Sequence, residues 1–235
     1  MKNAVFNWSG GKDSALCLYY CLKEKNVKVQ YLLTTVNKVF KRVSMHGVRI
    51  ELLEAQAKSI GVELKEIFLP ENPTLKVYNN IMKKKLIGLK KQGIDYSVYG
   101  DIFLEDLRQY REQKLSEVSM KGLFPLWGRS TTELIKEFIE LGFKAIIVCV
   151  NEKYLNKTFA GKVIDYSLLN ELPSNVDPCG ENGEFHSFVF DGPIFNKPIN
   201  FSIGDLVYKK YESKNKKENT NFDGGFWYRD LLMNI

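Results

Sequence analysis

The stretch SGGKDS occupies residues 9–14 and follows the apolar run NAVFNW at residues 3–8. After it, apolar side chains recur at Ala15, Leu18 and Leu22, which is the spacing of a helix. In this strand–turn–helix the two glycines allow a tight turn and let the backbone approach a ligand closely. The first amides of the helix would point at that ligand, and the helix dipole favours an anion there. The two serines and the lysine add hydroxyl donors and a cation, so the stretch predicts a phosphate-binding turn.

Two common phosphate loops do not fit this stretch. The Walker motif requires Ser or Thr after its lysine, whereas Asp13 follows the lysine here. The GxGxxG fingerprint of dinucleotide-binding proteins is also absent. A glycine-rich turn that only caps a helix is the simpler alternative. The position of all six residues within a strand–turn–helix favours ligand binding over that alternative.

The same six residues match the signature SGGxDS, and the stretch resembles the PP-loop of ATP pyrophosphatases. The resemblance implies that the loop grips the β- and γ-phosphates of ATP, while chemistry at the α-phosphorus releases pyrophosphate. It also implies that Asp13 is catalytic and helps to hold the Mg²⁺ ion that neutralises the triphosphate. The implied ATP-binding residues of the loop are Ser9, Gly10, Gly11, Lys12, Asp13 and Ser14.

The overall composition is typical of a soluble globular protein. Hydrophobic residues make up 44% and charged residues 26% of the 235 residues, and the net charge is +6. This charge suits anionic ligands such as nucleotides, but nucleic acid is not expected as a partner. No stretch approaches the roughly 18 consecutive apolar residues of a membrane span, and the start of the chain turns polar too soon for a secretory signal. With four cysteines and no CxxC pair, we expect a cytoplasmic protein with reduced thiols and no membrane contact.

Strand and helix patterns alternate through the first half of the chain. Apolar runs predict strands at residues 3–8, 29–36, 62–70, 95–101 and 123–127. Helical spacing separates each strand from the next, including a long charged helix at about residues 104–120. This order predicts an α/β fold with a doubly wound, parallel, five-stranded sheet, and the PP-loop resemblance implies the HUP type of that fold.

The pattern changes after Gly128. One amphipathic helix and the apolar strand AIIVCV (145–150) are followed by mixed segments rich in Asn, Gly, Pro and aromatic residues. We therefore expect a PP-loop nucleotide-binding domain at residues 1–128. A smaller α+β domain that binds the acceptor is expected at residues 129–235.

Two later segments narrow the family. They are GDIFLEDLRQYREQKLSEVSMKGLFPLW (100–127) and DPCGENGEFHSFVFDGPIF (177–195). Together with SGGKDS they resemble the diphthine–ammonia ligase family, including its prokaryotic relatives of unassigned substrate, over essentially the whole chain. The resemblance implies that a carboxylate on a modified histidine of elongation factor 2 is adenylated by ATP. Ammonia then attacks the acyl-adenylate and AMP leaves.

The second segment also departs from the family pattern. The established ligases read close to CGEGGEYET followed by DAP, whereas this chain reads CGENGEFHS followed by DGP. Asn182, His186 and Gly192 sit at positions where the pattern differs, next to the expected acceptor pocket. This difference does not change the expected use of ATP. It leaves two classes of acceptor, a modified protein side chain or a small carboxylate.

The sequence GENGEFH supplies candidate catalytic groups. Glu181, Glu184 and His186 surround glycines that allow a tight loop, and such a set could bind magnesium, hold ammonium or act as a general base. Asn182 and Gly183 are expected to contact the substrate. A short acidic loop that is only a solvated turn is the alternative.

Residues at two strand ends are further candidates for nucleotide contacts. Gly100 and Asp101 are the last residues of the predicted strand at 95–101, and ligand contacts concentrate at such strand ends in this type of sheet. His46 follows the second strand, near the place where PP-loop proteins seat adenine. A structural or merely exposed histidine is the alternative for His46.

Two arginines are candidates for binding a phosphate or a carboxylate of the substrate. Arg108 and Arg111 are three residues apart, and therefore share one face of the predicted helix. Exposed salt bridges with Glu105 or Glu112 are the alternative.

Three functions fit these observations. The first is an ATP-dependent amide-forming ligase that uses ATP, Mg²⁺ and ammonia and could form a homodimer. The second is a PP-loop enzyme that modifies tRNA, which would need a reactive cysteine pair. The third is a sensor that binds an adenine nucleotide without turnover.

Overall fold

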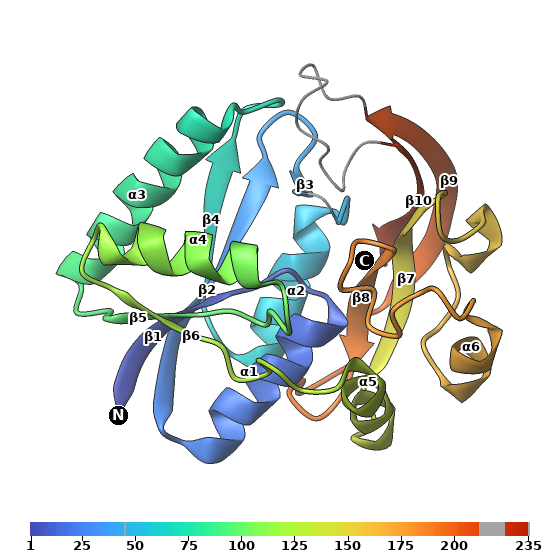
Figure 1. Cartoon of the computed structure of the whole chain (residues 1–235), viewed down its shortest axis with the longest axis horizontal. Helices are drawn as coiled ribbons and strands as arrows, with labels where there is room; N and C mark the ends of the chain where they lie inside the picture. Colours follow the sequence, from blue (N-terminus) through green and yellow to red (C-terminus); the bar gives the residue numbers. More distant parts are fainter. Residues whose placement is uncertain (45, 212–223, 235) are drawn as a thin grey trace.

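The computed structural model describes residues 1–44, 46–211 and 224–234 (Figure 1). In the described residues a first sheet has five parallel strands: β1 (Lys2–Asn7), β2 (Val27–Asn37), β4 (Leu64–Leu69), β5 (Tyr96–Val98) and β6 (Lys121–Leu123). Strand β2 pairs with β1 and β4, while β1 pairs with β5 and β5 with β6. The predicted doubly wound α/β fold is confirmed.

Two details of this sheet differ from the prediction. A two-residue strand, β3 (Arg42–Val43), adds an antiparallel sixth member next to β2. The fifth parallel strand ends at Leu123 instead of spanning 123–127. Pro125 has no N–H to donate to a neighbouring strand, and the Trp127 amide donates to the Phe124 carbonyl at 3.1 Å in a turn.

Four helices connect the parallel strands and cover both faces of the sheet. They are α1 (Lys12–Glu24), α2 (Ile50–Ile60), α3 (Leu75–Lys91) and α4 (Glu105–Ser116). Figure 1 shows α3 and α4 on one face and α1 and α2 on the other. The central strand β1 is apolar on both sides because Ala4, Val5 and Phe6 are all fully buried between these layers.

A second, antiparallel sheet follows in the chain. Its strands are β7 (Lys144–Asn151), β8 (Phe185–Asp191), β9 (Phe201–Tyr211) and β10 (Gly224–Met233), in the order β8-β7-β10-β9. Three helical segments accompany it: α5 (Thr131–Glu140), η1 (Lys157–Phe159) and α6 (Tyr166–Glu171). Buried side chains of α1, α2, β7 and β8 belong to one core, so the second sheet packs against the α1/α2 layer. This packing brings β8 to the beginning of α1.

An ion-pair cluster also joins the two sheets. The Asp230 carboxylate on β10 lies 2.8 Å from Arg42 Nη1 and 2.8 Å from Arg49 Nη2. Burial would raise the pKa of Asp230, but hydrogen bonds and charge from the two arginines lower it to about 2.

We expect Asp230→Asn to lower the free energy of unfolding at neutral pH by about 2 kcal/mol. Because the folded pKa of Asp230 is depressed, its contribution is present above the unfolded pKa of about 4 and is lost as pH falls through about 2. Urea unfolding at several pH values measures this. The control Asp205→Asn on β9 should change little, and identical pH profiles for Asp230→Asn and the wild type would contradict the prediction.

Candidate functional site

The SGGKDS stretch forms the turn between β1 and α1, as the sequence predicts. Gly10 adopts a φ of 77°, and Gly11 is the N-cap of α1. The Ser9 hydroxyl accepts a hydrogen bond from the Gly11 amide at 3.2 Å. The amides of Asp13 and Ser14 lie in the first turn, where N–H groups have no partner inside the helix. The loop thus presents amides and the positive end of the helix dipole to an anion.

The glycines at this turn are required by close packing. A Cβ on Gly10 would lie 2.8 Å from the Gln56 side-chain oxygen, and its positive φ strains any other residue. A Cβ on Gly100 would lie 3.1 Å from the Asp13 carbonyl carbon and oxygen. Gly100 therefore lets the end of β5 pass directly beside the loop.

Gln56 was not among the predicted site residues, but it holds the loop in place. Its side chain is fully buried, accepts a hydrogen bond from Trp8 Nε1 at 2.9 Å and donates to the carbonyls of Gly10 (3.1 Å) and Val189 (2.6 Å). The available signal is a polar residue on the apolar face of α2, next to Leu52 and Leu53. A buried amide in such a position must find hydrogen-bond partners.

The 177–195 segment lies against the loop. The Val189 amide donates to the Gly10 carbonyl at 2.9 Å, and the Lys12 amide donates to the Ser187 hydroxyl at 3.1 Å. The Lys12 ammonium also donates to the Cys179 carbonyl. Strand β8 and the turn before it are therefore bonded directly to the phosphate-binding backbone.

Lys12 was expected to reach the phosphates with its ammonium, but the structure places that group inside the protein. The residue is 3% exposed, and its Nζ lies 2.7 Å from Asp13 Oδ2. Burial opposes the charge, but Asp13 and other acidic neighbours outweigh it and raise the pKa of Lys12. The Asp13 side chain is 29% exposed and remains accessible to a ligand. Lys12 thus joins the loop to the 177–195 segment as a buried cation.

The two glutamates of GENGEFH have different environments. Glu184 is 1% exposed and accepts hydrogen bonds from the Asp177 amide (3.0 Å), the Asn182 amide (2.9 Å) and Asn182 Nδ2 (3.1 Å). These bonds hold the turn closed, and they engage Asn182 as well. Gly183 has a φ of 86° and no other atom near its Cβ position. We propose that Glu184 and Asn182 position this loop, in place of the catalytic and substrate-binding roles expected from sequence.

Glu181 instead faces the start of α1 and the end of β5. Its Oε1 accepts a hydrogen bond from the Ile102 amide at 2.9 Å. Burial and the nearby Asp13 carboxylate raise the pKa of Glu181 to about 7, against the lowering effect of the Ile102 amide and Lys12. A carboxyl group with such a pKa is present in both protonation states near neutral pH, as a general acid or base requires.

The arginine candidates have protein partners. Arg111 Nε lies 2.6 Å from Asp101 Oδ2, and the guanidinium stacks on Tyr99, with 4.3 Å from its central carbon to the ring centre. Asp101 and Arg111 therefore neutralise each other beside the loop. Arg108 pairs with Glu112 at 3.1 Å and lies over the Trp127 ring, which matches the salt-bridge alternative.

The two predicted histidines meet at this site. The ring centres of His46 and His186 are 4.4 Å apart with an angle of 35° between the planes. A Cβ on Gly11 would lie 3.4 Å from His46 Cε1. The pair therefore sits between the PP-loop and β8.

The donor set suits a magnesium ion shared with a triphosphate. In the part of the chain that the structure describes, no group of three or more His, Cys, Asp or Glu side chains could hold a metal ion alone. Mg²⁺ usually binds one or two carboxylates together with substrate phosphates, so the accessible Asp13 carboxylate is sufficient. The residues present therefore fit the expected ion.

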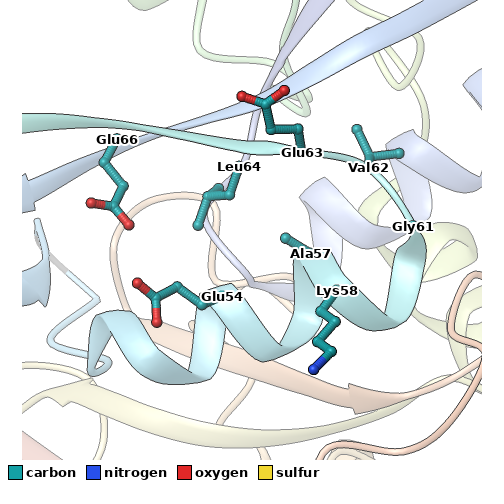
Figure 2. A pocket seen from close by; sticks show the side chains of 8 residues that line it. All are labelled: Glu54, Ala57, Lys58, Gly61, Val62, Glu63, Leu64 and Glu66. Carbon is teal, nitrogen blue, oxygen red and sulfur yellow. The ribbon is translucent and has the colours of Figure 1, made fainter.

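The structure also has two cavities away from the PP-loop. A cavity of about 390 Å³ lies between the end of α2 and the start of β4, with Glu54, Lys58 and Glu66 around it (Figure 2). Strands β1, β2 and β4 are parallel. The start of β4 therefore lies at one end of the strands, and the PP-loop, which follows β1, lies at the other end. A second cavity of about 430 Å³ lies between β4 and α3. No predicted site residue lines either cavity.

The doubly wound sheet and the loop at the end of β1 define an α/β protein of the PP-loop ATP-pyrophosphatase class. Comparison with family models narrows this class. The model of the diphthamide synthase N-terminal domain matches residues 1–122, and that of the diphthamide synthase C-terminal domain matches residues 130–220. The chain belongs to the diphthamide synthase family.

Individual relatives agree with this assignment. The diphthine–ammonia ligase of Rattus norvegicus is 27% identical over 224 residues, covering 85% of this chain and 82% of that protein. The human ligase is 24% identical over the same length and coverage. Among solved structures, a predicted subunit of tRNA methyltransferase from Methanocaldococcus jannaschii is 19% identical with a TM-score of 0.48, covering 84% of this chain and all of that one.

No helix in the described parts of the chain has the length and apolar character needed to span a membrane.

Proposed function

We propose that this chain is an ATP-dependent ligase of the diphthine–ammonia ligase type. It would adenylate a carboxylate and amidate it with ammonia, releasing AMP and pyrophosphate. The observation that carries the proposal is the amide-lined PP-loop bonded to the 177–195 segment through Gly10 and Lys12. Family membership and relatives named as ligases support it.

The arrangement suits this chemistry. A carboxylate is a poor electrophile, and transfer of AMP gives it a leaving group. The loop amides would hold the triphosphate, and Asp13 would share Mg²⁺, which stabilises negative charge on the phosphates when bound. An acyl-adenylate hydrolyses easily, so the 177–195 segment over the loop would exclude water. We propose residues 1–128 as the nucleotide domain and residues 129–235 as the acceptor side.

The cysteines do not favour the alternative of tRNA thiolation. All four are buried. Cys179, the one next to the site, donates from its Sγ to the Thr131 carbonyl, and burial raises its thiol pKa. A reactive cysteine needs the opposite, an accessible thiol of lowered pKa.

Product analysis tests the proposal. With ATP labelled at the α-phosphate, ammonium chloride and elongation factor 2 carrying the unamidated carboxylate, we expect labelled AMP and an equal amount of unlabelled pyrophosphate, both dependent on ammonium. The control lacks the elongation factor, and an assay with small carboxylates tests the other acceptor class. ADP and phosphate as the main products would contradict the proposal.

A further inference from the structure

The chain contains two histidines, 140 residues apart in sequence, and the fold places their rings 4.4 Å from each other. His46 comes from the turn after β3, and His186 from β8. They meet where β8 is bonded to the PP-loop, with His46 Cε1 3.4 Å from the Cβ position of Gly11. Two elements from different sheets thus build one imidazole pair at the site.

One nitrogen of this pair has a free lone pair. His46 Nδ1 is out of contact with solvent and has no hydrogen-bond partner among the described residues. The His46 ring also interacts with the Ser187 backbone. Because Nδ1 has no partner, we assign the ring proton to Nε2, which leaves Nδ1 as the acceptor. A buried acceptor without a donor is unfavourable, because it has lost its hydrogen bonds to water. Such an atom calls for a ligand that donates.

The surroundings select a neutral ligand. Burial, and after it the charge of Lys12, lower the pKa of His46 to about 4. Burial, His46 and Lys12 lower the pKa of His186 well below its usual value. The rings therefore stay neutral at physiological pH, and His46 cannot satisfy Nδ1 by taking up a proton. The same ammonium of Lys12 disfavours a cation at this position.

We propose that His46 and His186 form the ammonia subsite, in which His46 Nδ1 accepts a hydrogen bond from neutral NH₃ and the His186 ring closes the other side. This inference rests on the proposed function, because ammonia is the second substrate of that reaction. A hydroxyl or amino group of the nucleotide could offer the same donor chemistry. The experiment therefore separates the two sources.

NMR spectroscopy of protein labelled at the histidine ring nitrogens gives a direct test, since only two rings contribute signals. We expect ammonium chloride to shift the His46 Nδ1 resonance in a saturable way. Potassium chloride at the same ionic strength should not shift it, and the ammonium-dependent shift should persist when a non-hydrolysable ATP analogue is bound. No shift with ammonium, an equal shift with potassium, or loss of the ammonium-dependent shift once the ATP analogue occupies the site would each overturn the proposal.

Variants add an independent measurement. His46→Phe keeps a flat ring without the lone pair, and we expect it to raise the KM for ammonium about tenfold, the loss of one hydrogen bond, with the KM for ATP unchanged. His46→Gln keeps a side-chain acceptor and should fall between His46→Phe and wild type; it also serves if His46→Phe does not fold. An altered KM for ATP with an unchanged KM for ammonium overturns the subsite. If the NMR shift is seen but AMP release does not depend on ammonium, the proposed function fails while the subsite stands.

Discussion

Replacing Gly11 with valine is expected to weaken ATP binding by on the order of a hundredfold or more. Gly11 is the N-cap of α1, and a Cβ there would lie 3.1 Å from the Ser187 carbonyl oxygen and 3.4 Å from His46. A branched side chain would fill the narrow space between the PP-loop and β8. The loop must then shift, so its amides no longer converge on the phosphates. Calorimetric titration with a non-hydrolysable ATP analogue measures the loss.

A matched substitution controls for general effects of valine on folding. Gly88 lies in α3 with no atom within 4 Å of its Cβ position, so Gly88→Val should leave ATP affinity unchanged. Thermal unfolding of both variants shows whether they are folded. Unchanged ATP affinity in a folded Gly11→Val protein would place the nucleotide site elsewhere.

Local patterns explain why much of the first sheet could be predicted. Strand β1 is apolar on both faces, and the glycine turn and the helical spacing follow it directly, so one short stretch contains the whole motif. Strand β3 could not be found this way, because two residues are too few for any periodicity. The apolar run LFPLW predicts a strand at residues 123–127, a few residues beyond the true one. The strand cannot continue there because Pro125 has no N–H to donate to a neighbouring strand.

The site itself depends on contacts between distant parts of the chain. The bond from the Lys12 amide to Ser187 spans 175 residues, and it is the packing of β8 that buries the Lys12 ammonium. The SGGKDS motif carries no sign of this burial. Glu181 and Glu184 are likewise the same residue type in one short loop. Glu181 faces the PP-loop and Glu184 lies inside the turn. This difference depends on backbone angles in the loop, such as the φ of 67° at Gly180.

We propose Glu181 as the general base that removes a proton from the attacking nitrogen. Glu181→Gln is expected to reduce ammonium-dependent AMP release by about a hundredfold or more and to leave ATP affinity nearly unchanged. The reason is that glutamine keeps the size of the side chain but cannot accept the proton. A single-turnover assay with saturating ATP measures the rate, and calorimetry measures the affinity.

The pH dependence adds a sharper criterion. A base must be ionised, and the pKa of Glu181 is about 7, so wild-type activity, measured at a constant saturating concentration of neutral NH₃, should rise with pH through about 7 and then level off. The residual activity of Glu181→Gln should lack this rise. Because the folded pKa lies above the unfolded value, ionised Glu181 destabilises the fold as pH increases. The variant should therefore unfold at the same or a higher temperature than wild type above neutral pH.

Glu184→Gln separates catalysis from positioning within the same loop. The Glu184 carboxylate accepts three hydrogen bonds, and an amide nitrogen cannot accept from the N–H groups that donate them. We therefore expect a loss of about 1–3 kcal/mol in stability and a lower unfolding temperature. Its remaining activity should still rise with pH through about 7, because Glu181 is intact. If instead Glu181→Gln keeps the rise of activity with pH and Glu184→Gln loses it, Glu184 is the base and Glu181 has the positioning role.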